Sequence, residues 1–161
     1  MNKKFDIILW GATGFTGKLV AEYFLKEYGL NKSLNWAIAG RNKDKLEKLR
    51  YKLKTVSKAA LEIPILIGDS HEIKSLSKIV KQTKVICTTV GPFMEYGILL
   101  VKACIDNKTD YCDITGETPF IKTNIESYHT LAVKRRIKIV HCCGYDSIPS
   151  DLGCLMVQDF S

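Results

Sequence analysis

The segment that most constrains this chain is a glycine-rich stretch in which glycine stands at positions 11, 14 and 17. An apolar run at residues 5–10 precedes it, and an apolar pattern with helical spacing follows at residues 18–25. In such a strand–turn–helix unit, Gly11 allows the tight turn, Gly14 lets the backbone approach a phosphate, and Gly17 lets helix and strand pack closely. The sequence therefore predicts a pyrophosphate cradle at a helix N-terminus, where free N–H groups and the helix dipole attract an anion.

The other residues of this loop supply the expected phosphate donors. We expect the backbone N–H groups of Gly14, Phe15 and Thr16 to face the phosphates, with the Thr16 hydroxyl as a further donor. Thr13 lies between the first two glycines and joins the predicted cofactor-binding set. Phe15 is large for a phosphate turn, so we expect it either to pack beneath the loop or to face the substrate side.

Apolar runs alternate with helical patterns along the whole chain. Strands are expected at residues 6–10, 35–39, 63–67, 85–89, 110–113 and 137–142. Helices are expected at residues 17–28, 43–57, 72–81, 97–107 and 119–135. The strands are continuously apolar, as in sheets that are covered on both faces. The pattern predicts an α/β fold, a doubly wound parallel sheet of about six strands with helices on both faces.

Ligands of such sheets bind beyond the carboxyl ends of the strands, so the residue after each strand is a candidate site residue. The second strand is followed by Gly40 and Arg41, without the Asp or Glu that grips the ribose hydroxyls in NAD-preferring sites. Arg41 instead offers a planar cation that can fork onto a 2′-phosphate and stack on adenine. The expected cofactor is therefore NADP rather than NAD.

The ends of the third and fourth strands add further candidates. Asp69 either accepts a hydrogen bond from the adenine amino group or caps the following helix, as Asp often does. Gly91, Pro92 and Phe93 follow the fourth strand, where Gly91 permits close approach and Pro92 stiffens the turn. We expect this loop to lie over the nicotinamide ribose, with a plain strand-to-helix turn as the alternative.

Polar residues also follow the last two strands, at residues 113–117 and 144–153. The side chains of the second segment, 144–153, are suited to holding a carboxamide or a substrate. Asp146 and Asp151 are candidates for a catalytic acid or base by position only. The alternative is that Ser150 or Asp151 caps the final helix.

Composition narrows the class of protein. A chain of 161 residues suits one domain, and its net charge of +7 is concentrated at residues 42–58 and 134–136. We interpret these basic segments as solvated helix faces, because no nucleic-acid motif accompanies them. The six cysteines include no C-x-x-C pair, which favours a reducing, cytoplasmic location and predicts no metal site. No apolar run approaches membrane-spanning length.

Five motifs occur in a characteristic order. They are Gly-Ala-Thr-Gly-Phe-Thr-Gly at 11–17, Ala-Gly-Arg at 39–41, Val-Gly-Pro-Phe at 90–93, Tyr-Cys-Asp-Ile-Thr-Gly-Glu at 111–117 and Gly-Tyr-Asp-Ser-Ile-Pro-Ser-Asp-Leu-Gly at 144–153. In this succession the chain resembles the saccharopine dehydrogenase-like oxidoreductases, and within them the branch that contains the trans-acting enoyl reductases. The resemblance covers essentially the whole chain.

This resemblance implies an NAD(P)-binding Rossmann domain at residues 1–150, which positions a nicotinamide for hydride transfer. Residues 151–161 are then expected to start a helix that leads to a second, substrate-binding domain. The substrate stays open between small molecules, such as saccharopine or an imine, and a lipid-linked enoyl group. The alternative function is a non-catalytic NADP-binding or interaction module. Because Leu152, Leu155 and Met156 share one helix face, we also expect self-association through residues 148–160.

Overall fold

A computed structural model describes residues 3–30 and 33–160 of the chain. Its centre is one six-stranded sheet in the order β3-β2-β1-β4-β5-β6, in which every neighbouring pair is parallel. The strands are β1 (Phe5–Trp10), β2 (Trp36–Gly40), β3 (Ile65–Ile67), β4 (Thr83–Thr88), β5 (Asp110–Asp113) and β6 (Ile139–Val140). The predicted doubly wound parallel sheet is confirmed.

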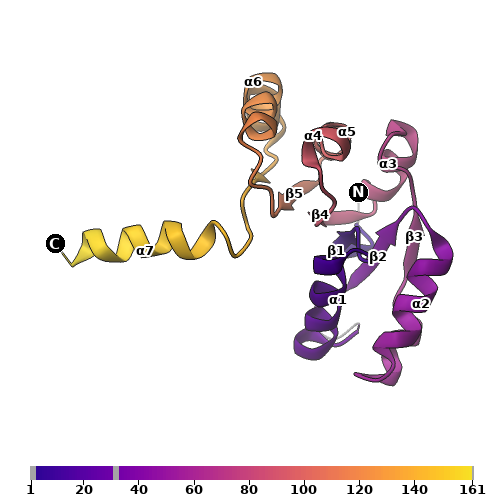
Figure 1. Cartoon of the computed structure of the whole chain (residues 1–161). Coiled ribbons are helices and arrows are strands. Elements are labelled where there is room, and N and C mark those ends of the chain that lie inside the picture. The colour runs from indigo at the N-terminus through magenta and orange to yellow at the C-terminus, as the bar shows by residue number, and fades with distance from the viewer. Residues whose placement is uncertain (1–2, 31–32, 161) are drawn as a thin grey trace.

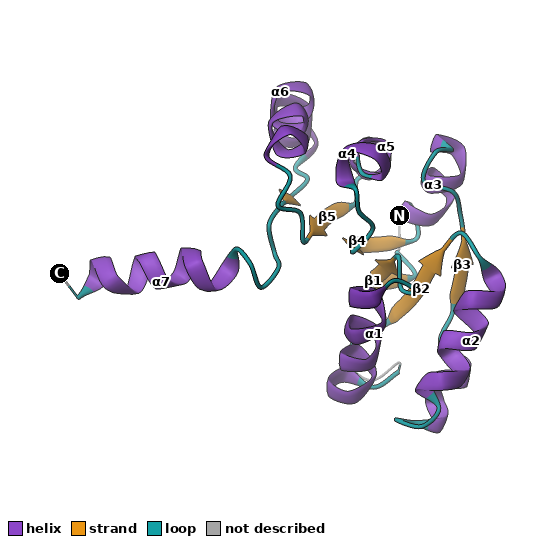
Figure 2. Cartoon of the chain, in the orientation of Figure 1, coloured by secondary structure: helices purple, strands orange, loops and turns teal. Residues whose placement is uncertain are grey.

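Helices cover both faces of this sheet. They are α1 (Phe15–Tyr28), α2 (Lys43–Leu53), α3 (Ile73–Val80), α4 (Phe93–Tyr96), α5 (Ile98–Asp106), α6 (Thr118–Arg135) and α7 (Ile148–Asp159), with a short 3₁₀ helix, η1, at Lys58–Glu62. Figure 1 shows α1 and α2 on one side of the sheet and α3, α4, α5 and α6 on the other. Figure 2 shows α7 extending away from all of them.

The core consists of two apolar layers, one on each face of the sheet. Successive residues of β1 point to opposite faces, so Ile8 and Trp10 join the layer under α3 to α6, whereas Leu9 joins the layer under α1 and α2. Strand β2, which lies between β3 and β1, is buried along its whole length. This two-sided burial explains why the strands read as continuous apolar runs rather than alternating ones.

The observed elements differ from the predicted ones mainly at their ends. Helix α2 ends at Leu53 and does not continue to residue 57 as predicted. The hydroxyl of Ser57 instead accepts a hydrogen bond from the N–H of Ala59 at the start of η1. Strand β6 is shorter than predicted because Cys142 adopts a φ of 61° and donates its N–H to the side chain of Asp113. The four-residue α4 was not predicted as a separate helix.

The last helix begins three residues earlier than expected. Its N-cap is Ser147, whose side chain makes no capping hydrogen bond, so the alternative that Ser150 or Asp151 caps this helix is wrong. No residue of α7 is buried. Within the described part of the chain, no helix is long and apolar enough to cross a membrane.

Candidate functional site

A pocket of about 310 Å³ lies at the carboxyl edge of the sheet, where β1, β2, β3 and β4 end. Six of the predicted cofactor residues line it: Gly11, Thr13, Gly14, Arg41, Asp69 and Gly91. Six further lining residues were not predicted: Trp10, Gly40, Ser70, Thr89, Val90 and Tyr96. The structure thus brings together residues from four strand ends, as expected for a ligand crevice of this fold.

A side chain would meet different surroundings at each of the three loop glycines. Gly11 has a φ of +85°, and a Cβ there would overlap the side chain of Val90. A Cβ at Gly17 would overlap the carbonyl oxygen of Gly11, so Gly17 is what allows α1 to pack against the loop. At Gly14 a Cβ would meet nothing closer than that same oxygen, at 3.4 Å. The protein itself therefore tolerates a side chain at Gly14, and the space in front of it stays open for a ligand.

The N-terminus of helix α1 lies beside this open space and has no side-chain cap. Gly14 is its N-cap and supplies no side-chain hydrogen bond, and the first turn contains no acidic residue. The first N–H groups of a helix have no carbonyl partner within the helix. Together with the helix dipole, they form a binding site for an anion.

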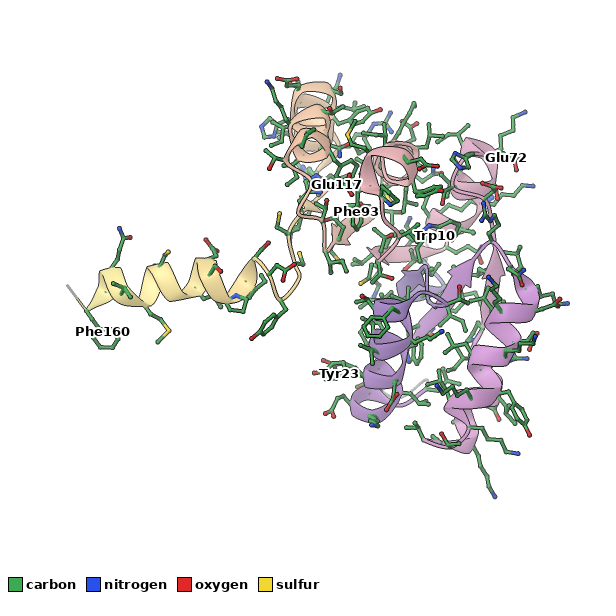
Figure 3. The ribbon with its side chains drawn as sticks, in the orientation of Figure 1. Trp10, Tyr23, Glu72, Phe93, Glu117 and Phe160 are labelled. Atoms are coloured by element: carbon green, nitrogen blue, oxygen red, sulfur yellow. The ribbon has the colours of Figure 1, made fainter. Side chains whose placement is uncertain are left out.

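Phe15 does not pack beneath the loop, since 84% of its surface is exposed. It shares one side of α1 with the exposed Leu19 and Tyr23, which follow at intervals of four residues. Figure 3 shows Tyr23 pointing away from the body of the protein. Thr16 and Gly17 follow Phe15 in the helix and do not line the pocket. Of the loop, only residues up to Gly14 form the pocket wall.

Arg41 is exposed at the end of β2. The next residue, Asn42, is occupied with capping α2, because its side chain accepts the N–H of Lys45 at 2.9 Å. Tyr96 also lines the pocket, and its ring lies 5.2 Å from that of His71. A side-chain hydrogen bond to Glu95 raises the pKa of Tyr96, and the positive charge of Arg41 opposes that shift. The pocket wall therefore includes an arginine and an aromatic side chain, Arg41 and Tyr96.

Asp69 stabilises the turn before α3 rather than capping the helix. Its Oδ1 accepts the N–H of His71 at 2.9 Å, and its own N–H donates to Ser75 Oγ at 3.1 Å. The N-cap of α3 is Glu72. The capping alternative for Asp69 is thus wrong, and the carboxylate lies fixed at the pocket wall.

The loop after β4 is divided between pocket and core. Gly91 lines the pocket, but Pro92 and Phe93 do not. Pro92 is the N-cap of α4, and the Phe93 ring is buried 5.8 Å from that of Phe120. The expectation that Phe93 forms part of the cofactor surface is therefore corrected, because its apolar ring is held in the core.

Trp10 lines the pocket, although in the sequence it is only the last residue of an apolar run. Its side chain is buried, and Nε1 has no hydrogen-bond partner among the described residues. A buried indole N–H normally finds an acceptor.

Asp113 organises the neighbouring ends of β5 and β6. Its buried carboxylate accepts four hydrogen bonds, from the Tyr111 hydroxyl, His141 Nδ1 and the backbone N–H groups of Thr115 and Cys142. Burial, reinforced by the charge of Asp113 and the hydrogen bond to it, raises the pKa of Tyr111. Asp113 is therefore an internal anchor of these strand ends.

The two weak catalytic candidates lie outside the pocket. Asp146 is exposed in the connection between β6 and α7, and Asp151 is exposed in the first turn of α7. Among the residues that the structure describes, no group of three or more His, Cys, Asp or Glu could hold a metal ion. A second hollow of about 240 Å³ under α6 has mainly apolar walls and no helix N-terminus for a phosphate.

The glycine turn, the open helix N-terminus and the crevice at the strand ends define a Rossmann-type dinucleotide-binding domain. Residues 7–140 match the model of the saccharopine dehydrogenase NADP-binding domain family. The chain belongs to this family, and NADP is the cofactor of the domain.

Individual relatives agree with this assignment. The chain is 39% identical over 152 residues to a trans-acting enoyl reductase of Mycobacterium tuberculosis, and 38% identical over 152 residues to that of Mycobacterium leprae. Each match covers 94% of this chain but only 35% of the relative, so the chain spans about a third of the length of these proteins.

Solved structures share the fold. Apo saccharopine dehydrogenase (L-Glu forming) from Saccharomyces cerevisiae superposes with a TM-score of 0.76 at 18% identity, over 96% of this chain and 31% of that one. The NADP(H) complex of the Citrobacter triphenylmethane reductase gives 0.60 at 19% identity, over 84% of this chain and 48% of that one.

Proposed function

We propose that this chain is the cofactor-binding part of an NADP-dependent oxidoreductase and that its pocket orients the nicotinamide for hydride transfer. The observation that carries the proposal is the meeting of the glycine loop with Arg41 at one pocket. The open space that a side chain at Gly14 would enter fits a bound dinucleotide.

Each part of the pocket has a definite task in this proposal. The N–H groups at the start of α1 bind the pyrophosphate, and the Arg41 guanidinium forks onto the 2′-phosphate. The carboxylate of Asp69 accepts a hydrogen bond from the adenine amino group, and the backbone at Gly91 lies against the nicotinamide ribose. When bound, NADPH supplies the hydride, while the protein binds it, orients it and excludes water.

The reaction of the whole protein is proposed from its relatives. Two of them are named trans-acting enoyl reductases, which favours an enoyl group as the hydride acceptor over an imine. Hydride turnover with a panel of enoyl and imine substrates tests this choice. If the chain binds NADPH but no substrate oxidises it, the non-catalytic binding module is favoured instead.

The location and the assembly of the protein follow from other features. The six cysteines are all unpaired, which is typical of a reducing compartment, and we place the protein in the cytoplasm. The exposed apolar side chains of α7 support self-association through residues 148–160.

The preference for NADP depends on Arg41, and its replacement tests the proposed function. Arg41→Ala should weaken NADPH binding by about 1–3 kcal/mol, the size of a charge-assisted hydrogen bond, and should leave NADH unchanged. Nucleotide fluorescence titration measures both affinities. Lys48→Ala is the matched control, because it removes a positive charge from the exposed face of α2, away from the pocket wall. Equal affinities of the parent chain for NADPH and NADH would contradict the assignment.

A further inference from the structure

Glu117 joins two segments that are far apart in the sequence. Its Oε1 accepts the backbone N–H of Phe93 at 2.7 Å, and its Oε2 accepts the N–H of Met94 at 2.9 Å. Figure 3 shows Glu117 and Phe93 side by side, between α6 and α4. These two N–H groups belong to the first turn of α4, which directly follows Gly91 and Pro92.

A carboxylate that accepts two successive N–H groups fixes a peptide segment more firmly than a single neutral hydrogen bond. Such charge-assisted bonds are roughly twice as strong as neutral ones. Glu117 is itself held in place, because its N–H donates to Thr115 Oγ1 at 3.0 Å, and the Thr115 N–H donates to Asp113 at 3.1 Å. The contact to α4 is therefore anchored in the buried end of β5.

The segment between β4 and α4 is also fixed at its other end. Thr89 donates its N–H to the carbonyl of Trp10 at 3.2 Å and its hydroxyl to that of Gly11 at 3.4 Å. Gly91 lies between this anchor and the Glu117 contact, and its backbone faces the pocket. The position of Gly91 is thus set from the glycine loop on one side and from Glu117 on the other.

We propose that Glu117 is a positioning residue that holds Gly91 against the nicotinamide half of the cofactor. This inference rests on the proposed function and adds a residue outside the pocket to it. Glu117 does not line the pocket. Its effect should therefore be confined to the nicotinamide half, and this separates positioning from a general role in stability.

Glu117→Gln tests the proposal with two probes, NADPH and 2′,5′-ADP, which carries the adenosine and the 2′-phosphate but no nicotinamide. The amide keeps the size of the side chain but turns an NH₂ group toward one of the two N–H donors. NADPH affinity should fall about tenfold, the effect of roughly one charge-assisted hydrogen bond. Binding of 2′,5′-ADP should stay at the parental level.

Glu126→Gln is the matched control on the same helix, where Glu126 is exposed and pairs only loosely with Lys122 at 3.8 Å. Glu117→Asp is the second variant, since it keeps the charge and draws it back by one carbon, and it should show the same selective loss. Equal weakening of both probes, or no weakening of NADPH, in the folded variants would overturn the inference. A parent chain that binds neither probe would instead contradict the proposed function.

Discussion

Gly14 and Gly17 lie three residues apart but differ in what a side chain would meet. A branched side chain at Gly14 would enter the open space in front of α1, whereas one at Gly17 would overlap the carbonyl of Gly11. Gly14→Val should therefore abolish NADPH binding and keep the parental melting temperature. Gly17→Val should destabilise the fold by about 1–3 kcal/mol, as overpacking commonly does. Thermal unfolding and nucleotide titration of both variants check this, and a folded Gly14→Val chain with parental affinity would place the phosphate site elsewhere.

At the scale of single residues, the sequence predicts those whose role depends on a short segment of the chain. Gly11 and Arg41 were predictable because a turn and the absence of an acid are visible in short segments. The contact of Glu117 with Phe93 was not, since it joins residues 24 positions apart. The burial of Phe93 was missed for the same reason, because its neighbour Phe120 comes from α6. The unpartnered Nε1 of Trp10 has no signature in sequence.

At the scale of elements, Asp6 links the beginnings of three strands. Its Oδ2 accepts the N–H of Asn35, just before β2, and its Oδ1 accepts Lys84 Nζ of β4 at 2.7 Å. Two hydrogen bonds lower the pKa of Asp6, and the one from Lys84 has a larger effect than the one from Asn35. A carboxyl group with a lowered folded-state pKa stabilises the fold above its unfolded pKa, and this contribution is lost as the pH falls through the folded value.

Asp6→Asn should therefore destabilise the protein at neutral pH by about 0.5–1 kcal/mol, a modest value because the pair is partly exposed. The difference from the parent should shrink as the pH falls below the ordinary Asp pKa of 3.8. Urea unfolding at pH 7, 5 and 3 measures it. A difference that does not change with pH would mean that the ionised carboxylate contributes nothing.

The same scale shows which elements the sequence could place. All six strands and the five long helices that cover the sheet were predicted, because their apolar periodicity is strong. Strand β6 was overestimated, since its end is set by a hydrogen bond to Asp113 from another strand. Helix α4 was missed because it has only four residues, directly after a Gly-Pro turn, and is stabilised by Glu117.

At the scale of the whole molecule, α7 is a helix that buries none of its residues. Figure 1 shows it projecting away from the sheet and from the other helices. A helix of 12 residues is marginal in water on its own, so it needs an apolar surface to pack against. Leu152, Leu155 and Met156 offer such a surface on one side, and Phe160 extends it at the end labelled in Figure 3.

A second copy of the chain can supply an apolar surface for α7 to pack against. The mass measured by light scattering should therefore rise with protein concentration. Leu155→Glu should return the protein to a monomer, because a charge cannot be buried unpaired between two apolar helices. Val133→Glu is the control, since it changes another exposed apolar residue, on α6. A parent chain that stays monomeric at every concentration would exclude self-association through α7. An effect of Val133→Glu equal to that of Leu155→Glu would place the contact on another surface.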